Sequence, residues 1–204
     1  MNPLADNSFA EGQDQNRLMH ARSGDRKALE DLLERHQGWI FNIALRMLYH
    51  PQDAEDATQE ILVKILTRLS SFEGRSSFRT WLYRIAVNHC LNRLRRRSLV
   101  RFFSLSRDEE EPAVDPPDPA PDPERSLDAA RRWRAAKERI ERLPANQRAV
   151  LVLAKFEGLS YREIAAILSI TESAVESRLV RAMRTLVRAQ GSELSAVSDK
   201  GVKG

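Results

Sequence analysis

The sequence has little cysteine, little glycine and no long apolar run, and each shortage excludes a class of protein. The single cysteine, Cys90, cannot form an internal disulfide, and with four scattered histidines it makes no zinc-ligand spacing. The glycines form neither a GxGxxG motif nor a GxxxxGKS/T motif, so a nucleotide-binding enzyme has no support. The longest uninterrupted apolar run covers six residues, 149–154, which is too short to span a bilayer.

Signals for processing and catalysis are also absent. The N-terminus lacks a basic start followed by an apolar stretch, so it does not form a secretory signal. No cluster of histidine, cysteine and acidic residues has catalytic spacing. We therefore expect a cytoplasmic protein that is not an enzyme, that does not insert into membranes and that needs neither a cofactor nor a metal ion.

The charges are divided into blocks that the net value of +4 conceals. Residues 75–101 carry eight arginines and no acid, and residues 129–190 carry thirteen basic and six acidic residues. Between them, residues 108–128 carry nine acids and one base. Two basic blocks separated by an acidic block suggest two surfaces for a polyanion, although an arginine run is also typical of a solvated helix face.

The chain divides into two units at the same positions. Six of the nine prolines lie between Pro112 and Pro123, among acidic residues. Proline removes backbone donors and blocks helix formation, and the acids repel one another, which predicts an extended, disordered linker. We expect an N-terminal unit over 16–100, a linker over 101–126 and a C-terminal unit over 127–190. Each unit is near the size at which a hydrophobic core is only marginally sufficient.

Apolar residues recur with helical spacing throughout, so the predicted fold class is all-α. In the N-terminal unit, one helix covers the stretch from Ala28 to Leu48, and Pro51 interrupts the chain. Asp53 is expected to cap the next helix, and Ser76 or Ser77 the third, whose outer face presents arginines and asparagines. The buried stripe of the second helix is expected to contain Ala57, Ile61, Ile65, Leu66 and Leu69.

Aromatic residues lie beside the arginine-rich helix, a combination that suits single-stranded nucleic acid, because phosphates bind cations and unstacked bases bind ring faces. Phe78 and Trp81 are expected in the core. Phe72 precedes the helix and is therefore the expected stacking residue.

The C-terminal unit predicts a helix-turn-helix motif. Residues 146–156 form a helix that Gly158 ends. Ser160 and Glu163 form a capping box for a short helix that ends near residue 168. Thr171 caps a last helix that runs to about residue 188. A short helix, a tight turn and a longer basic helix are typical of major-groove binding, although they also occur in plain helical bundles.

Three segments together resemble the extracytoplasmic-function group of bacterial sigma factors. They are DAEDATQEILVKIL (53–66), SSFRTWLYRIAVNHCLNRLRRR (76–97), and LPANQRAVLVLAKFEGLSYREIAAIL with TESAVESRLVRAMRTL (143–186). The resemblance implies two small helical domains, called region 2 and region 4, that bind RNA polymerase core, direct it to promoters and open the DNA. The implied partners are the clamp helices of the largest polymerase subunit, the flap of the second subunit, promoter DNA and an anti-sigma factor.

The resemblance also assigns roles to particular residues. The residues implied to dock on the polymerase clamp are Asp56, Gln59 and Glu60. Those implied near the −10 element, where amides can read a flipped base and arginines hold phosphates, are Phe72, Arg75, Arg79, Arg84, Asn88, Asn92 and Arg93. Those implied at the −35 element are Arg162, Thr171, Glu176, Ser177, Arg178, Val180, Arg181 and Arg184.

Glu176 departs from the pattern, because relatives often carry a basic residue at this position. A carboxylate cannot bind the acceptors of guanine, but it can accept a hydrogen bond from N4 of cytosine. We therefore expect a −35 preference that differs from the common one of the family.

Two other classes of protein fit parts of the sequence. Residues 143–186 would also suit the helix-turn-helix of a LuxR-type regulator, but a response regulator needs a receiver domain with alternating strands and helices. Residues 16–100 show only helical periods. An RNA-binding protein would use the arginine block alone. Binding of purified polymerase core in the absence of DNA distinguishes a sigma factor from both.

Overall fold

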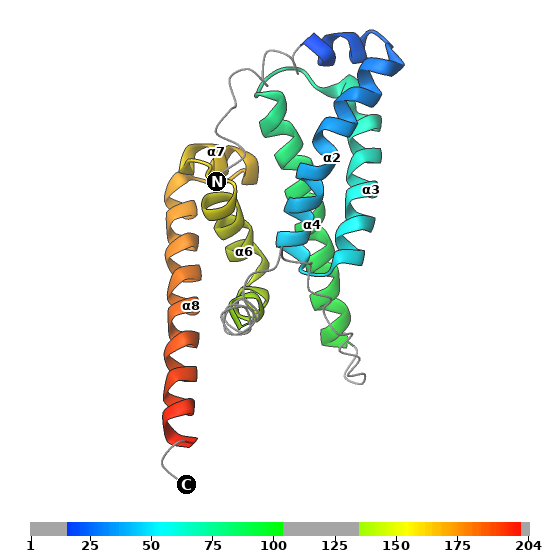
Figure 1. The fold of residues 1–204 in the computed structure, drawn as a ribbon. Coiled ribbons are helices and arrows are strands. Elements are labelled where there is room, and N and C mark those ends of the chain that lie inside the picture. Colours follow the sequence, from blue (N-terminus) through cyan, green and yellow to red (C-terminus); the bar gives the residue numbers. More distant parts are fainter. Residues whose placement is uncertain (1–15, 104–134, 201–204) are drawn as a thin grey trace, which may run out of the picture.

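The computed structural model describes residues 16–103 and 135–200. Within these residues every regular element is helical, which confirms the all-α prediction. The helices of the first half stand beside those of the second half (Figure 1). The expected linker, 101–126, lies outside the described residues except for its first three residues, which continue a helix.

The first half contains three long helices. They are α2 (Arg26–Leu48), α3 (Pro51–Arg68) and α4 (Phe78–Phe103), with the 3-10 turn η1 (Leu69–Ser71) after α3. The Asp25 side chain caps α2 by accepting hydrogen bonds from two backbone N–H groups of its first turn. Ser77 caps α4 as predicted, since its Oγ accepts a hydrogen bond from the backbone N–H of Thr80 at 3.1 Å.

The start of α3 corrects one prediction. Pro51 is the first helical residue and His50 is the N-cap, so Asp53 lies inside the first turn and does not cap the helix. Proline suits this first position because its fixed φ is helical and its missing N–H has no intrahelical acceptor there. The Asp53 carboxylate is bound instead by Arg93 and Arg97 of α4.

The second half contains the predicted helix-turn-helix. Its elements are α6 (Ala145–Leu151), the π-helical η2 (Val152–Phe156), α7 (Tyr161–Leu168) and α8 (Glu172–Lys200). The capping box of α7 is present, with Ser160 Oγ accepting from the Glu163 N–H at 3.3 Å and the Glu163 carboxylate accepting from the Ser160 N–H at 2.8 Å. Thr171 caps α8 as predicted. The observed α8 is longer than predicted.

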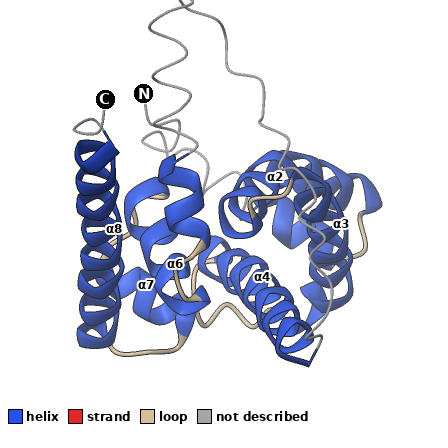
Figure 2. Cartoon of the chain, turned by 90° about the horizontal axis from the view of Figure 1, so that it is seen from below, coloured by secondary structure: helices blue, strands red, loops and turns tan. Residues whose placement is uncertain are grey.

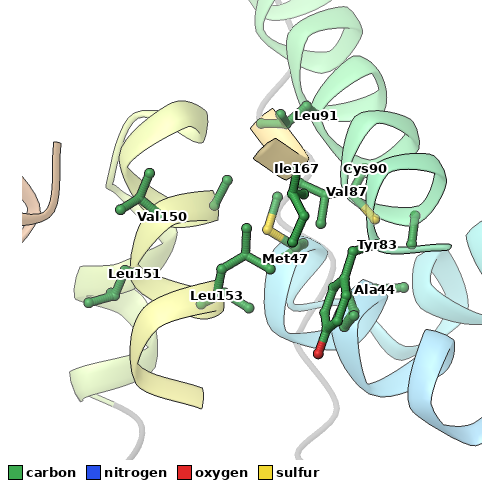
Figure 3. Packing of buried hydrophobic residues seen from close by; sticks show 14 of the residues in the cluster. Ala44, Met47, Tyr83, Val87, Cys90, Leu91, Val150, Leu151, Leu153 and Ile167 are labelled. Atoms are coloured by element: carbon green, nitrogen blue, oxygen red, sulfur yellow. The ribbon is translucent and has the colours of Figure 1, made fainter. Parts of the chain in front are cut away.

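Buried apolar side chains of both halves form one continuous cluster. Leu153 of η2 and Ile167 of α7 point toward Met47 of α2 and Val87 of α4 (Figure 3). Figures 1 and 2 both place α2 and α4 next to the second half, with α3 and α8 on the outside. The sequence predicts two units joined only by a tether. The shared cluster adds buried apolar area that neither small unit supplies alone.

Candidate nucleic-acid and protein interfaces

A network of charges holds the polar side of α3 against α4. The Arg93 guanidinium of α4 lies 2.8 Å from Asp53 Oδ1, 3.4 Å from Asp56 Oδ2 and 3.6 Å from Glu60 Oε1. Burial acts to raise the pKa of Asp53, but the hydrogen bond from Arg93 and the charge of Arg97 hold this pKa below its ordinary value. The negative charges of the α3 carboxylates and the positive charges of the α4 arginines therefore neutralise one another.

An exposed face of α3 combines polar and apolar side chains. Asp56, Gln59 and Glu60 are exposed on it, and it continues toward the end of the helix with Val63, which is 57% exposed, and Leu66, which is 43% exposed. Together these five residues are called the α3 face. Exposed apolar side chains beside carboxylates fit a protein partner, because carboxylates repel the phosphates of DNA.

Two residues of the α3 face were not part of the predicted site. The prediction that Leu66 is buried is wrong, because the buried stripe follows Ile61, Ile65 and Leu69 at spacings of four and leaves residue 66 on the next face. The helical spacing of 56, 59, 63 and 66 was the signal that could have revealed Val63 and Leu66.

His89 of α4 lies beneath the α3 face and is 8% exposed. Its Nδ1 accepts a hydrogen bond from Lys64 Nζ at 2.5 Å, and its Nε2 lies 3.6 Å from Glu60 Oε2. Burial and, after it, the charge of Lys64 lower the pKa of His89. His89 is therefore neutral, and by accepting a hydrogen bond from the Lys64 ammonium group it links α4 to α3.

Some residues expected at the −10 element are accessible. Asn88 and Asn92 are exposed on α4, and because they are four residues apart, their amide groups share one side of the helix. Arg75 precedes α4, is exposed and pairs with Glu73 at 2.5 Å. These three side chains can meet nucleic acid without any change in the fold.

Three further arginines expected at the −10 element have partners within the protein. Arg79 Nη2 donates to the Tyr83 hydroxyl at 3.3 Å. Arg84 Nη2 donates to the backbone carbonyl of Ala166 in α7 at 2.8 Å. Arg93 binds the α3 acids. A DNA phosphate would share each of these guanidinium groups, which carry five N–H donors, with the partner that it binds here.

The structure corrects the stacking role expected of Phe72. This residue is 7% exposed and packs in a second apolar cluster with Leu18, Leu32 and Leu69. Its ring centroid lies 5.6 Å from that of Phe78 and 5.4 Å from that of Trp81. A ring enclosed in this way contributes to the core and has no free face for a base.

The helix-turn-helix presents the residues expected at the −35 element. Buried Val175, Leu179 and Ala182 hold one side of α8 against α6 and α7. The opposite side and the start of α7 expose all but one of the expected residues, and the exception, Arg178, is half-buried. The exposed ones are Arg162, Thr171, Glu176, Ser177, Val180, Arg181 and Arg184.

Two exposed apolar residues of α8 were missed by the sequence reasoning. Met183 is 41% and Val187 is 62% exposed, and they follow Val180 at helical spacing. Apolar side chains between arginines suit a DNA groove, since the thymine methyl group is the one apolar feature of a base edge there.

Within the described parts of the chain, no three histidine, cysteine or acidic side chains lie close enough together to hold a metal ion. No helix in these parts is both long enough and apolar enough to cross a membrane.

A helical unit with an arginine-rich helix, joined to a helix-turn-helix unit, is the architecture of a DNA-binding transcription protein. Residues 18–100 match sigma-70 region 2, and residues 133–186 match sigma-70 region 4. The RNA polymerase sigma-H factor of Pseudomonas aeruginosa is 32% identical over 87% of this chain and 93% of the relative. The ECF RNA polymerase sigma-E factor of Escherichia coli is 34% identical over 85% of this chain and 92% of the relative.

A solved structure has the same fold. CnrH in complex with the cytosolic domain of CnrY is 28% identical, with a TM-score of 0.60 over 88% of this chain and 98% of that chain. The chain belongs to the extracytoplasmic-function family of RNA polymerase sigma factors. It directs promoter-specific transcription initiation as a non-catalytic subunit of the polymerase, which confirms the family and function predicted from the sequence over the LuxR-type and RNA-binding alternatives.

Proposed function

We propose that this sigma factor binds polymerase core through the α3 face, with the clamp helices of the largest subunit as the partner. The observation that carries the proposal is that carboxylates and apolar side chains share one exposed face of a helix whose other side is fixed in the core. Apolar contact supplies affinity, and the carboxylates supply orientation toward a basic partner.

Reversing two charges tests this surface. The double variant Asp56→Arg with Glu60→Arg should weaken core binding at least about ten-fold, a loss of about 1.4 kcal/mol or more, while helical content is unchanged. The matched control reverses Asp31 and Glu34, which are exposed on α2. Binding is measured by anisotropy of labelled protein titrated with purified core, without DNA. Equal affinity of the two double variants would contradict the assignment.

Promoter recognition is proposed to use both halves. Asn88 and Asn92 would read a base of the −10 element, because an amide can donate and accept at one base edge. Residues of α8 would enter the −35 major groove, where Arg181 favours guanine and Glu176 favours cytosine. Phosphates near the −10 element would be held by Arg75, Arg79, Arg84 and Arg93. Phosphates near the −35 element would be held by Arg162, Arg178 and Arg184, with Thr171 and Ser177 beside them.

The salt dependence of binding separates phosphate contacts from base contacts. Arg184→Ala should weaken all promoters similarly and reduce the slope of log affinity against log salt by about one unit. Arg181→Ala should lower the preference for particular −35 sequences as well. Holoenzyme binding to two promoters that differ only at −35, measured over a salt series, compares the two variants. A slope that Arg184→Ala leaves unchanged would remove its phosphate contact.

The remaining assignments are also proposals. We place region 2 within 16–100, a tether within 101–126 and region 4 within 127–190, with the flap of the second polymerase subunit as the partner of region 4. An anti-sigma factor is the proposed regulator and the cytoplasm the proposed location. The relative CnrH is bound to the cytosolic domain of CnrY, which supports a regulator that acts from the cytosolic side.

A further inference from the structure

The last turns of α4 carry aliphatic side chains that no described part of the chain covers. Arg97 binds Asp53 in the first turn of α3, and α4 continues beyond this pair to residue 103. Figure 1 shows this end of α4 extending past the ends of α2 and α3. Leu99 is 57% and Val100 is 62% exposed. These two side chains therefore add nothing to the hydrophobic core.

One side of α4 continues from the exposed amides to Leu99. Leu99 follows Asn92 by seven residues, which is about two helical turns, so both side chains lie on the same side of the helix. Arg95 lies between them on this side, since its Nη1 is 3.5 Å from Asn92 Oδ1. The exposed side chains of Asn88, Asn92, Arg95 and Leu99 are called the α4 face.

The charge around the α4 face favours an anionic partner. Residues 75–101 contain eight arginines and no acid. Arg93 and Arg97 are paired with carboxylates of α3. Arg95 and Arg96 are exposed and form no ion pair with any residue that the structure describes. Two uncompensated guanidinium groups beside the α4 face can bind phosphates.

The aliphatic residue of the α4 face distinguishes duplex DNA from single-stranded DNA. Unstacked bases bind to aromatic rings, and Leu99 offers no ring. The base edges of duplex DNA present one apolar group in the major groove, the C5-methyl group of thymine. An exposed leucine among arginines therefore fits a groove in which this methyl group lies between phosphate strands.

We propose that the α4 face binds the duplex beside the −10 element, where Leu99 packs on a thymine methyl group and Arg95 and Arg96 bind phosphates. This contact extends the proposed −10 role of Asn88 and Asn92 and therefore rests on it. The major groove is wide enough to admit an α-helix. Two helical turns are about 10.5 Å, which is about three base pairs at 3.4 Å each. Leu99 therefore selects a thymine about three base pairs from the base that Asn92 reads.

Deoxyuridine is the probe for this contact, because it lacks only the C5-methyl group of thymidine and keeps the same base-pairing groups and charge. Burial of one methyl group against an aliphatic side chain corresponds to about a three- to four-fold change in affinity. The effect should occur at one promoter position and should require Leu99.

The first test compares promoter duplexes that carry thymine at each position flanking the −10 element in turn, on either strand, with duplexes that carry deoxyuridine there. At one position, deoxyuridine should weaken holoenzyme binding about three- to four-fold for the unchanged chain. Leu99→Ala should bind the two duplexes equally. The matched control is Val100→Ala, which removes an exposed aliphatic side chain about 100° further around the helix and should keep the response to deoxyuridine.

Two results would overturn the methyl contact. One is a response to deoxyuridine that is the same in Leu99→Ala and in the unchanged chain at every position, or absent from both. The other is weaker binding of Leu99→Ala to purified core without DNA, because Leu99 would then contact the polymerase. Leu99 is exposed, so its truncation leaves no cavity and the variant should fold normally.

The second test measures the phosphate contact. Arg96→Ala should reduce the slope of log affinity against log salt by about one unit in holoenzyme binding to the promoter. The control Arg26→Ala removes an exposed arginine of α2 and should leave the slope unchanged. An equal slope in the two variants would overturn the contact of Arg96 with phosphate.

The double variant Asn88→Ala with Asn92→Ala separates this proposal from the −10 assignment. If it relaxes the −10 preference while no thymine shows a response that depends on Leu99, the duplex contact fails and the −10 assignment stands. If it leaves the −10 preference unchanged while the response that depends on Leu99 is present, the −10 assignment fails and the duplex contact stands.

Discussion

Removing the side chain of Arg148 is expected to destabilise the folded protein substantially. Arg148 is 6% exposed. It donates to the carbonyl of Met47 at 2.7 Å, to the carbonyl of Glu141, and weakly to that of Leu143 at 3.5 Å. Each of the two stronger hydrogen bonds involves a charged donor and contributes about 1.5–3 kcal/mol, which gives about 3–6 kcal/mol for Arg148→Ala. The stability of a whole domain is only about 5–15 kcal/mol.

The assay is urea unfolding followed by far-ultraviolet circular dichroism, with the free energy of unfolding extrapolated to water. Arg148→Lys should lower the free energy of unfolding by about half as much as Arg148→Ala does, because an ammonium keeps the charge but cannot span several carbonyls as a planar guanidinium does. The exposed Arg142→Ala is the control and should change stability by less than about 0.5 kcal/mol. A loss below about 1 kcal/mol for Arg148→Ala would refute the reasoning, since it would mean that water replaces the guanidinium at these carbonyls.

Two further predictions concern protonation and helix capping. Because the pKa of His89 is lowered in the folded state, the contribution of His89 to the free energy of unfolding is fully present above about pH 6.5 and is lost as the pH falls through the folded pKa. His89→Gln should flatten this pH dependence when urea unfolding is repeated at a series of pH values. Ser160→Ala should cost about 1 kcal/mol. It should also raise the pKa of Glu163, which the hydrogen bonds of the Ser160 side chain and backbone now lower; an NMR titration of Glu163 with an unchanged midpoint would contradict the capping box.

The local parts of the fold could be predicted because a few neighbouring residues determine them. Ser160 and Glu163 form their capping box within one helical turn, and Thr171 caps α8 through the N–H of a residue three positions later. Periodic apolar residues then define which side of each helix is buried. These signals were sufficient for the helix-turn-helix, for the first-half bundle and for the expected −35 positions on α8 other than Arg178.

The parts that could not be predicted depend on contacts between distant residues. Glu157 meets donors more than a hundred positions away in α2, so no local pattern marks it as buried. Phe72 lies at the start of the loop before α4, a position that suits exposure, yet the residues before α2 cover it. Asp53 is placed where a cap is plausible, but its carboxylate is used by α4. In each case tertiary packing overrides a reasonable local interpretation.

The claim that one chain reads two promoter elements with two helical units is tested most directly by transcription from a library with randomised −10 and −35 positions. Purified core should give selected sequences at both elements only when this sigma factor is added. Asn88→Ala with Asn92→Ala should relax the −10 preference and leave the −35 preference intact, whereas Glu176→Arg should change the −35 preference alone. Base preferences that stay the same at both elements in these variants would contradict the account.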